Sequence, residues 1–180
     1  MHLYPWWFNY AFDNPVRRLF QKPERMLAPY LGEGMTALDL GCGMGFFSVE
    51  MARLVGPSGR VIAVDLRPRV LGVLMGRAER AGVQNRIRTH ECEVGALGLR
   101  DEVDFGLVFW MSHEVRDRAG LARELRVGLK PGGKLLVAEP KLHVPSKVFR
   151  AVLDAFEAAG MRLVERPRVG LSMAALLEKK

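Results

Sequence analysis

The sequence predicts an α/β fold in which helices pack on a doubly wound parallel sheet. From residue 36 onward, short apolar runs of strand length alternate with longer stretches of helical periodicity. The first, second and fourth of these runs are nearly continuously apolar, as expected for strands that are buried on both faces of a sheet. Turns rich in glycine and proline separate these segments. Alternation of this kind builds βαβ units, which place successive strands side by side in parallel.

The elements follow one another without a repeat or a low-complexity segment. We predict strands over residues 36–40, 60–66, 86–91, 103–110 and 133–140, and helices over 46–55, 69–82, 119–129 and 146–160. After Gly160, residues 162–170 and 171–180 are predicted to form two final strands joined by a tight connection. The Pro-Gly-Gly turn at 131–133 is expected to end the third helix and redirect the chain into a strand.

A chain of 180 residues fits one domain. Within it we distinguish residues 36–180, the predicted core, from residues 1–35, an aromatic N-terminal extension with a helical stretch. The extension carries Tyr4, Trp6, Trp7, Phe8, Tyr10 and Phe12. These rings suit a lid over a binding cleft, plain packing on the sheet, or docking at a membrane surface, and the sequence leaves the three open.

Composition indicates a cytoplasmic protein. Apolar residues make up 49% of the chain and charged residues 26%, and no stretch approaches the ~20 apolar residues of a membrane helix. The N-terminus lacks the layout of a signal peptide. The two cysteines, Cys42 and Cys92, have neither metal-site spacing nor the pattern of a disulfide framework.

The net charge of +7 has two interpretations. Arginines spread along the chain are consistent with an ordinary solvated surface. The alternative is an acidic substrate or a nucleic acid, which requires the fold to gather the cations on one face.

The turn at residues 39–45, Asp-Leu-Gly-Cys-Gly-Met-Gly, stands where the first strand ends and a helix begins. Glycines let a ligand approach the backbone closely, and a carboxylate about 20 residues later, here Asp65, is placed to accept hydrogen bonds from ribose hydroxyls. The pattern is GxGxG, with Phe46 where a dinucleotide motif has its third glycine. Asp39 would also repel a pyrophosphate. Together these features predict an adenosine-containing ligand other than a dinucleotide.

The segment ALDLGCGMGFFS resembles the first motif of class I S-adenosylmethionine-dependent methyltransferases, and VIAVDL, VDFGLVFWMSHEV and LKPGGKLLVAEP resemble later motifs of that family. The resemblance spans residues 36–140 and is nearest to the small "type 11" methyltransferases. It implies a Rossmann-like, mostly parallel seven-stranded sheet with an antiparallel last strand and helices on both faces. It also implies S-adenosylmethionine as cofactor.

By this resemblance, eleven residues are expected to contact the cofactor: Asp39, Gly41, Cys42, Gly43, Gly45, Asp65, Leu66, Cys92, Glu93, Val94 and Trp110. The chain departs from the family pattern at one of them. Glu93 stands where relatives usually have an aspartate near the adenine amino group, and its extra methylene puts that contact in doubt. Cys92 is expected to be an apolar wall and not a nucleophile.

Candidate catalytic residues follow two predicted strands at their carboxyl ends, where open α/β sheets bind ligands. His113 and Glu114 follow one strand, and His143 follows the next, shortly after Glu139. A histidine with a pKa near 6.5 can accept a proton at neutral pH, so His113, Glu114 and His143 are the candidates for acid–base work. The alternative is a solvated helix start at Glu114 and a loop at His143. These side chains are also acceptable magnesium ligands, but they form no compact motif, and we predict no metal site.

The sequence therefore predicts a methyltransferase that acts on a small-molecule acceptor. One alternative is an RNA or protein methyltransferase, motivated by the charge, although no RNA-binding motif is present. Another is a protein that binds the cofactor without catalysis. The methyl acceptor and the oligomeric state are left undecided, because acceptor pockets in this fold come from loops that differ among relatives.

Overall fold

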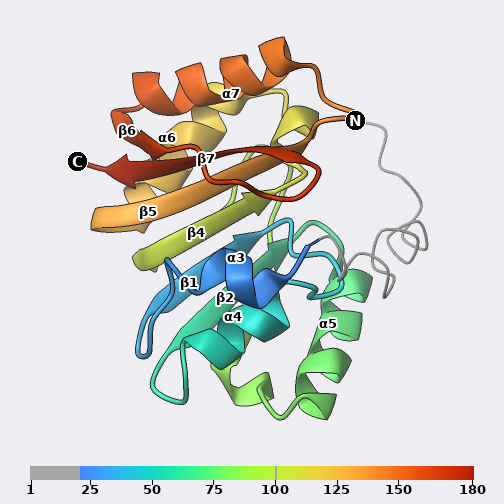
Figure 1. Cartoon of the computed structure of the whole chain (residues 1–180). Helices are drawn as coiled ribbons and strands as arrows, with labels where there is room; N and C mark the ends of the chain where they lie inside the picture. Colours follow the sequence, from blue (N-terminus) through green and yellow to red (C-terminus); the bar gives the residue numbers. More distant parts are fainter. Residues whose placement is uncertain (1–20, 100) are drawn as a thin grey trace. The chain divides into compact units, whose positions relative to one another are not determined.

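A computed structural model describes residues 21–99 and 101–180. Seven strands form a sheet in the order β3-β2-β1-β4-β5-β7-β6, drawn in Figure 1. The chain divides into two compact units, one ending at Glu91 and one spanning Cys92–Lys180. The aromatic residues of the N-terminal extension, from Tyr4 to Phe12, lie outside the described residues.

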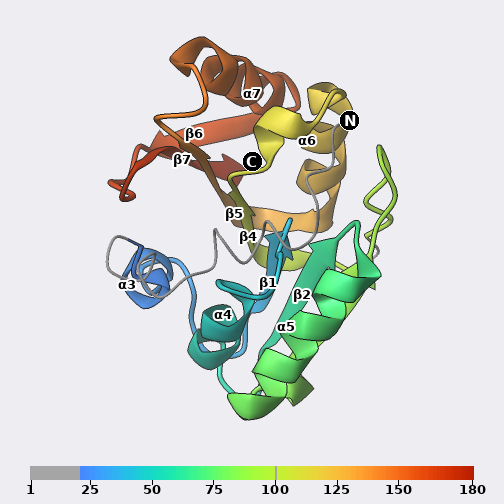
Figure 2. The ribbon, with the colours of Figure 1, turned by 90° about the vertical axis from the view of Figure 1, so that its right-hand side faces the viewer.

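The first unit carries three parallel strands, β1 (Thr36–Leu40), β2 (Arg60–Asp65) and β3 (Ile87–Glu91). Every residue of β1 is buried, as are five of the six residues of β2, so the apolar runs found in the sequence are the central strands of this unit. Helices α4 (Ser48–Leu54) and α5 (Pro68–Arg80) pack against β2 and β3, and Figure 2 shows both helices near β2.

The short helix α3 (Pro23–Leu27) packs against α4. Its first residue is Pro23. A proline is tolerated in the first turn because the missing N–H has no partner there in any helix. A 3₁₀ turn over Gln84–Arg86 leads into β3.

The second unit holds β4 (Val103–Phe109), β5 (Leu129–Pro140), β6 (Met161–Glu165) and β7 (Ser172–Lys179). β4 and β5 are parallel, whereas β7 is antiparallel to both β5 and β6. The predicted antiparallel last strand is thus confirmed, although six residues and not a tight turn join β6 to β7. Helices α6 (Arg118–Gly128) and α7 (Ser146–Ala158) pack on each other and around these strands.

The Pro-Gly-Gly segment differs from its prediction. Helix α6 ends at Gly128 and β5 begins at once, at Leu129, so the turn residues lie inside the strand. The pairing moves from Val103–Leu129 to Phe105–Lys134, which leaves extra residues on β5 as a bulge. Gly132, at φ +73°, supplies the left-handed backbone that such a bulge requires.

Among the helices of the described residues, none has the length and apolar character needed to span a membrane.

Candidate active site

The glycine turn of the first unit is held by backbone hydrogen bonds to β2. The amides of Gly41 and Cys42 both donate to the carbonyl of Val64, at 2.9 and 3.0 Å. Gly41, Gly43 and Gly45 all have positive φ, a region that residues with a side chain seldom adopt. The sequence therefore needs glycine at these positions for the shape of the turn.

Gly45 and Gly43 are needed for different structural reasons. A Cβ on Gly45 would stand 2.8 Å from Cγ of Leu74, so Gly45 is where α5 packs closely on the turn. A Cβ on Gly43 would meet no atom within 4 Å. Gly43 thus presents bare backbone to open space, which is the arrangement that a closely approaching ligand requires.

Asp65 ends β2 directly beside this open space. The residue is 6% exposed, and its Oδ2 accepts a hydrogen bond from the amide of Gly43 at 3.2 Å. Its Oδ1 accepts from both the amide and the Nε of Arg67, at 3.1 and 3.2 Å. A carboxylate has about four lone-pair positions, so Asp65 retains acceptor capacity beyond these three bonds. Leu66 follows it, half-buried.

Asp39, which opens the turn at 39–45, is still part of strand β1 and is only 2% exposed. Ser48, the fully buried first residue of α4, donates its hydroxyl to Asp39 Oδ2 at 2.5 Å. Sequence reasoning missed both Ser48 and Arg67. Their only sequence signal is position: one opens the helix after the turn, and the other follows the strand-terminal acid by two residues.

In the second unit, residues after β3 form an exposed turn. Glu93 and Ala96 exchange backbone hydrogen bonds of 3.2 Å, with Gly95 between them at φ +87°. Cys92 is half-buried and forms no disulfide in the described part of the chain, Glu93 is exposed, and Val94 is 72% exposed. The turn is anchored where the amide of the buried Leu97 donates to the carboxylate of Glu124 on α6 at 2.7 Å.

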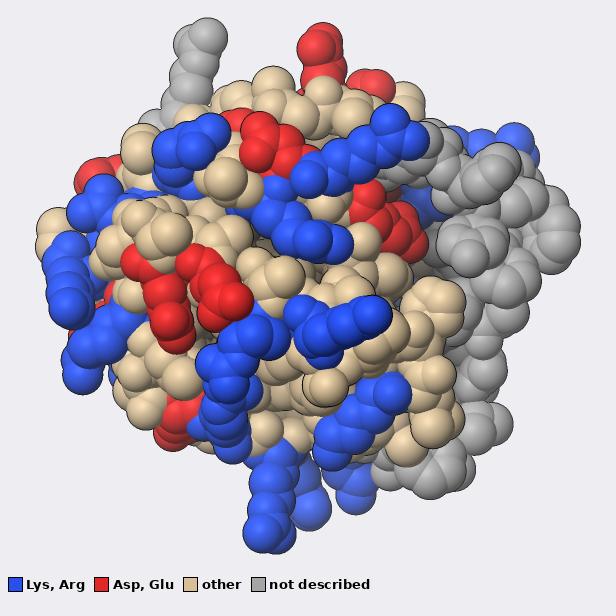
Figure 3. All heavy atoms as spheres, turned by 90° about the horizontal axis from the view of Figure 1, so that it is seen from above, with Lys and Arg blue, Asp and Glu red and all other residues tan. Residues whose placement is uncertain are grey.

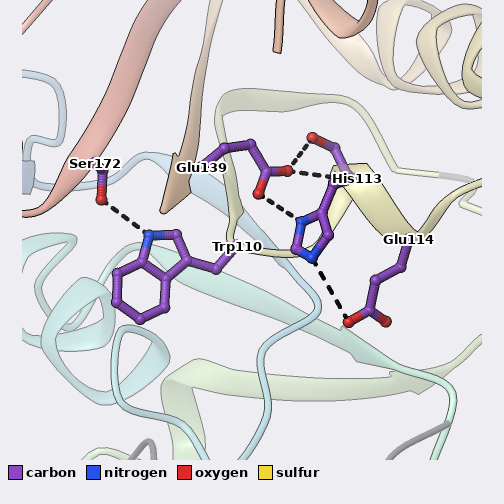
Figure 4. A network of polar contacts seen from close by, with 6 residues as sticks. Trp110, His113, Glu114, Glu139 and Ser172 are labelled. Carbon is purple, nitrogen blue, oxygen red and sulfur yellow. Dashed lines mark hydrogen bonds and ion pairs between the residues drawn. The ribbon is translucent and has the colours of Figure 1, made fainter. Parts of the chain in front are cut away.

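Trp110, directly after β4, has φ +58°, an uncommon conformation for a bulky residue. Its amide donates to the carbonyl of Ala138 at 2.8 Å, and its indole Nε1 donates to Oγ of Ser172 at 2.9 Å. The ring also stacks on Phe109. Figure 4 shows the indole pointing toward Ser172. Packing within this unit thus fixes the strained backbone.

The structure brings the candidate residues around His113 together. Its Nδ1 lies 2.6 Å from Oε2 of Glu139, and its Nε2 lies 4.0 Å from Oε1 of Glu114 (Figure 4). The ring of His143 stands edge-on to that of His113, with 5.3 Å between ring centres. His113 is half-buried, whereas Glu114 and His143 are exposed.

Glu139 organises this group. It is fully buried on β5, and its carboxylate accepts hydrogen bonds from the hydroxyl of the buried Ser112 and from the amide of His113 at 3.0 Å. With the imidazole, three donors converge on one carboxylate. Ser112, His113 and Glu114 form a 3₁₀ turn, which brings the hydroxyl, the amide and the ring to the same partner. Ser112 was missed in the sequence.

The hydrogen bond with Glu139 raises the pKa of His113 above its ordinary value of 6.5. The negative charges of Glu139 and Glu114 act in the same direction, while burial and the guanidinium of Arg118 oppose them. Because an ionised carboxylate can only accept, the proton of the neutral ring lies on Nδ1, and Nε2 is its acceptor. The arrangement is a base held by a carboxylate. Among the described residues, no three His, Cys, Asp or Glu side chains are grouped as a metal site requires.

The chain matches the family model described as "Methyltransferase domain" over residues 31–167. It is 32% identical over 157 residues to a ribosomal protein L11 methyltransferase of Pelotomaculum thermopropionicum, covering 86% of this chain and 47% of that protein. It is 34% identical over 121 residues to a ubiquinone/menaquinone biosynthesis C-methyltransferase of Pasteurella multocida, covering 65% and 45%. The chain thus spans about half the length of these relatives.

Among solved structures, a SAM-dependent methyltransferase from Aquifex aeolicus superposes with a TM-score of 0.88 at 24% identity, covering 99% of this chain and 100% of that one. This likeness confirms the predicted fold class. Together with the family match, it shows that the chain belongs to the class I S-adenosylmethionine-dependent methyltransferases.

Proposed function

We propose that this protein transfers a methyl group from S-adenosylmethionine to a small-molecule acceptor, with His113 as the general base. The observation that carries the proposal is the buried Glu139, which fixes the imidazole through Nδ1 and leaves Nε2 as its proton acceptor. In nucleophilic catalysis a base held by an orienting third group is the recurring arrangement. In the proposed reaction the nucleophile is an atom of the methyl acceptor and not of the protein.

The first unit is suited to hold the cofactor. Asp65 has acceptor capacity for ribose hydroxyls, and Gly43 offers open space directly beside it. S-adenosylmethionine, when bound, supplies a methyl group activated on a sulfonium sulfur. The other contacts that we propose are Asp39, Gly41, Cys42, Gly45 and Leu66 in the first unit, and Cys92, Glu93, Val94 and Trp110 in the second.

The second unit is suited to move a proton. An acceptor O–H or N–H loses its proton to Nε2 of His113, while Nδ1 keeps its hydrogen bond to Glu139. The resulting imidazolium is stabilised by Glu139 on one nitrogen and by Glu114, 4.0 Å from the other. Glu114 is exposed, so it connects the base to solvent, to which the proton finally passes.

We assign His143 a different part from that of His113. It has no carboxylate partner among the described residues, and it meets the His113 ring edge-on. We propose that it forms an aromatic wall beside the base. A general base must lie within hydrogen-bond reach of the proton that it removes, and of the two histidines His113 is the one whose ring is oriented by a carboxylate.

The proposal also covers the domain boundaries within the chain and the cellular compartment of the protein. We treat residues 36–180 as the methyltransferase core and residues 1–35 as an extension, of which α3 is the described helix. Neither Cys42 nor Cys92 is in a disulfide among the described residues, which supports a reducing compartment such as the cytoplasm.

The test has two readouts. Isothermal titration should show binding of S-adenosylmethionine and S-adenosylhomocysteine but not of NAD, and a panel of small acceptors should be screened for S-adenosylhomocysteine release. In the active assay, His113→Ala should lower turnover about 10²-fold or more, as expected for a lost general base, with cofactor affinity unchanged. His143→Ala should cost far less. Equal losses in the two variants would remove the assignment of His113.

A protein acceptor is the second candidate, because one relative is named as a ribosomal protein methyltransferase. The C-methyltransferase relative, named for quinone biosynthesis, supports a small acceptor instead. Incubation with radiolabelled cofactor and purified ribosomal proteins separates the two. Labelled protein, with no turnover of any small acceptor, would replace the first candidate by the second.

A further inference from the structure

A cavity of about 820 Å³ lies wholly within the second unit. Its walls are the first half of α7, the loop between β6 and β7, and the start of β7. The buried rings and methyl groups of Phe149 and Leu153 line it on the α7 side. The volume falls in the range of pockets that hold small ligands, roughly 300–1,000 Å³.

The charged side chains that line this cavity are all cationic. Lys141 comes from the end of β5, Lys147 and Arg150 from α7, and Arg166 and Arg168 from the β6–β7 loop. All five are exposed, and among the described residues none of them has a carboxylate as an ion-pair partner. Figure 3 shows Lys and Arg side chains spread across the face that α7 forms.

Five cations without a counter-charge around one hollow repel one another unless an anion enters. Two of them are three residues apart on α7, whose N-terminus also lines the cavity at Ser146. The first amides of a helix lack intrahelical partners and favour negative charge. Arginine forks bind the oxygens of phosphates and carboxylates in pairs. A phosphate carries more oxygens and more negative charge than a carboxylate, so it can engage several of these cations at once.

Hydrogen bonds and strand pairing within the second unit connect the cavity to the candidate base, His113. Ser172 lines the cavity and accepts the indole hydrogen bond of Trp110, three residues before His113. Ser172 and Met173 also pair with Pro140 and Glu139 of β5, and Glu139 holds His113. A ligand in the cavity would therefore lie next to the strand positions that support the base.

We infer that this cavity binds the phosphate group of a small, phosphorylated methyl acceptor. The inference rests on the proposed function and narrows its substrate class. A hollow of small-ligand volume favours a discrete phosphorylated molecule over the extended backbone of RNA, which would be tracked by a long groove. Part of the positive charge of the chain then serves to bind this phosphate, because the fold gathers five cations from separate segments around one cavity.

The experiment uses the full 180-residue chain and inorganic pyrophosphate as probe, titrated calorimetrically at fixed ionic strength beside sulfate. Pyrophosphate should bind more tightly than sulfate. Arg150→Gln and Arg168→Gln should each weaken pyrophosphate binding about tenfold, the loss of one charge-assisted contact. The matched control is Arg123→Gln, an exposed arginine of α6 outside the cavity, which should change the affinity less than about twofold. Thermal melts should show all three variants folded.

Pyrophosphate that binds no better than sulfate, or that weakens equally in Arg123→Gln, would overturn the inference. So would a single-stranded RNA that binds far more tightly than pyrophosphate with a steep salt dependence. S-adenosylmethionine affinity is measured on the same samples. If it is intact while pyrophosphate fails, only this inference falls. If the cofactor fails to bind, the proposed function falls, and with it the assignment of the phosphate to a methyl acceptor.

Discussion

Glu139 lies fully buried on β5 with its carboxylate 2.6 Å from Nδ1 of His113, a residue that follows a different strand 26 positions earlier. The pair sets both the direction of the imidazole and its basicity.

Glu139→Gln keeps the shape of the side chain and removes its charge. The pKa of His113 should fall, because the carboxylate is the main group that raises it. The acid limb of the pH–kcat profile should move to lower pH, and kcat should fall by at least about tenfold because the amide no longer fixes the tautomer. Glu114→Gln, at an exposed site, should move the limb less. A profile that stays in place in Glu139→Gln would show that His113 does not limit the rate.

The same pair should make stability depend on pH. The pKa of His113 is raised in the folded state, so protonation favours the fold. This contribution is complete below about pH 6.5 and is lost as the pH rises through the folded-state value. In urea unfolding, wild type should exceed His113→Gln most at about pH 5.5 and least at about pH 9. A difference that grows with pH would contradict the assigned direction.

Asp65→Ala should weaken S-adenosylmethionine binding by about 1.5–3 kcal/mol through lost hydrogen bonds to a charged acceptor. Titration calorimetry measures this directly. Glu79→Ala, which removes an exposed carboxylate from α5, is the matched control and should leave the affinity unchanged. Since Asp65 also accepts from Gly43 and Arg67, the melting temperature should be recorded with each titration. An unchanged affinity would assign Asp65 to the turn alone.

Gly45→Ala and Gly43→Ala should differ in what they damage. The new methyl group at position 45 meets Leu74 at 2.8 Å, at φ +86°, so the expected loss of stability is about 2–4 kcal/mol from overpacking and backbone strain. At position 43 the methyl group enters open space, and only the backbone strain of about 1–2 kcal/mol remains. Cofactor affinity should fall in Gly43→Ala. Urea unfolding and calorimetry on the two variants separate these effects.

Most strands and helices could be predicted from the sequence because their information is local: the apolar runs, the helical periodicity and the turn residues. The glycine turn and Asp65 were also predictable, since they lie one βαβ unit apart. Ser48, Ser112 and the Trp110–Ser172 bond were not. That bond joins residues 62 positions apart, and such a contact depends on the register of an antiparallel strand, which no local pattern encodes. The bulge at 130–133 was missed for a related reason, because a Pro-Gly-Gly run fits a turn and a bulge equally well.

The reversed direction of β7 has a consequence for the order in which the protein is made. A parallel strand would bring its last residues to the carboxyl end of β5, but β7 brings its first, so Ser172 arrives beside Pro140. The hydrogen bond of the Trp110 indole and one wall of the 820 Å³ cavity therefore form only when β7 is present. During synthesis, Trp110, His113 and Glu139 have all been added to the chain before Ser172, the hydrogen-bond acceptor of the indole, is made. A nascent chain halted before Ser172 would therefore carry the residues of the proposed base without the packing that holds the adjoining tryptophan in place.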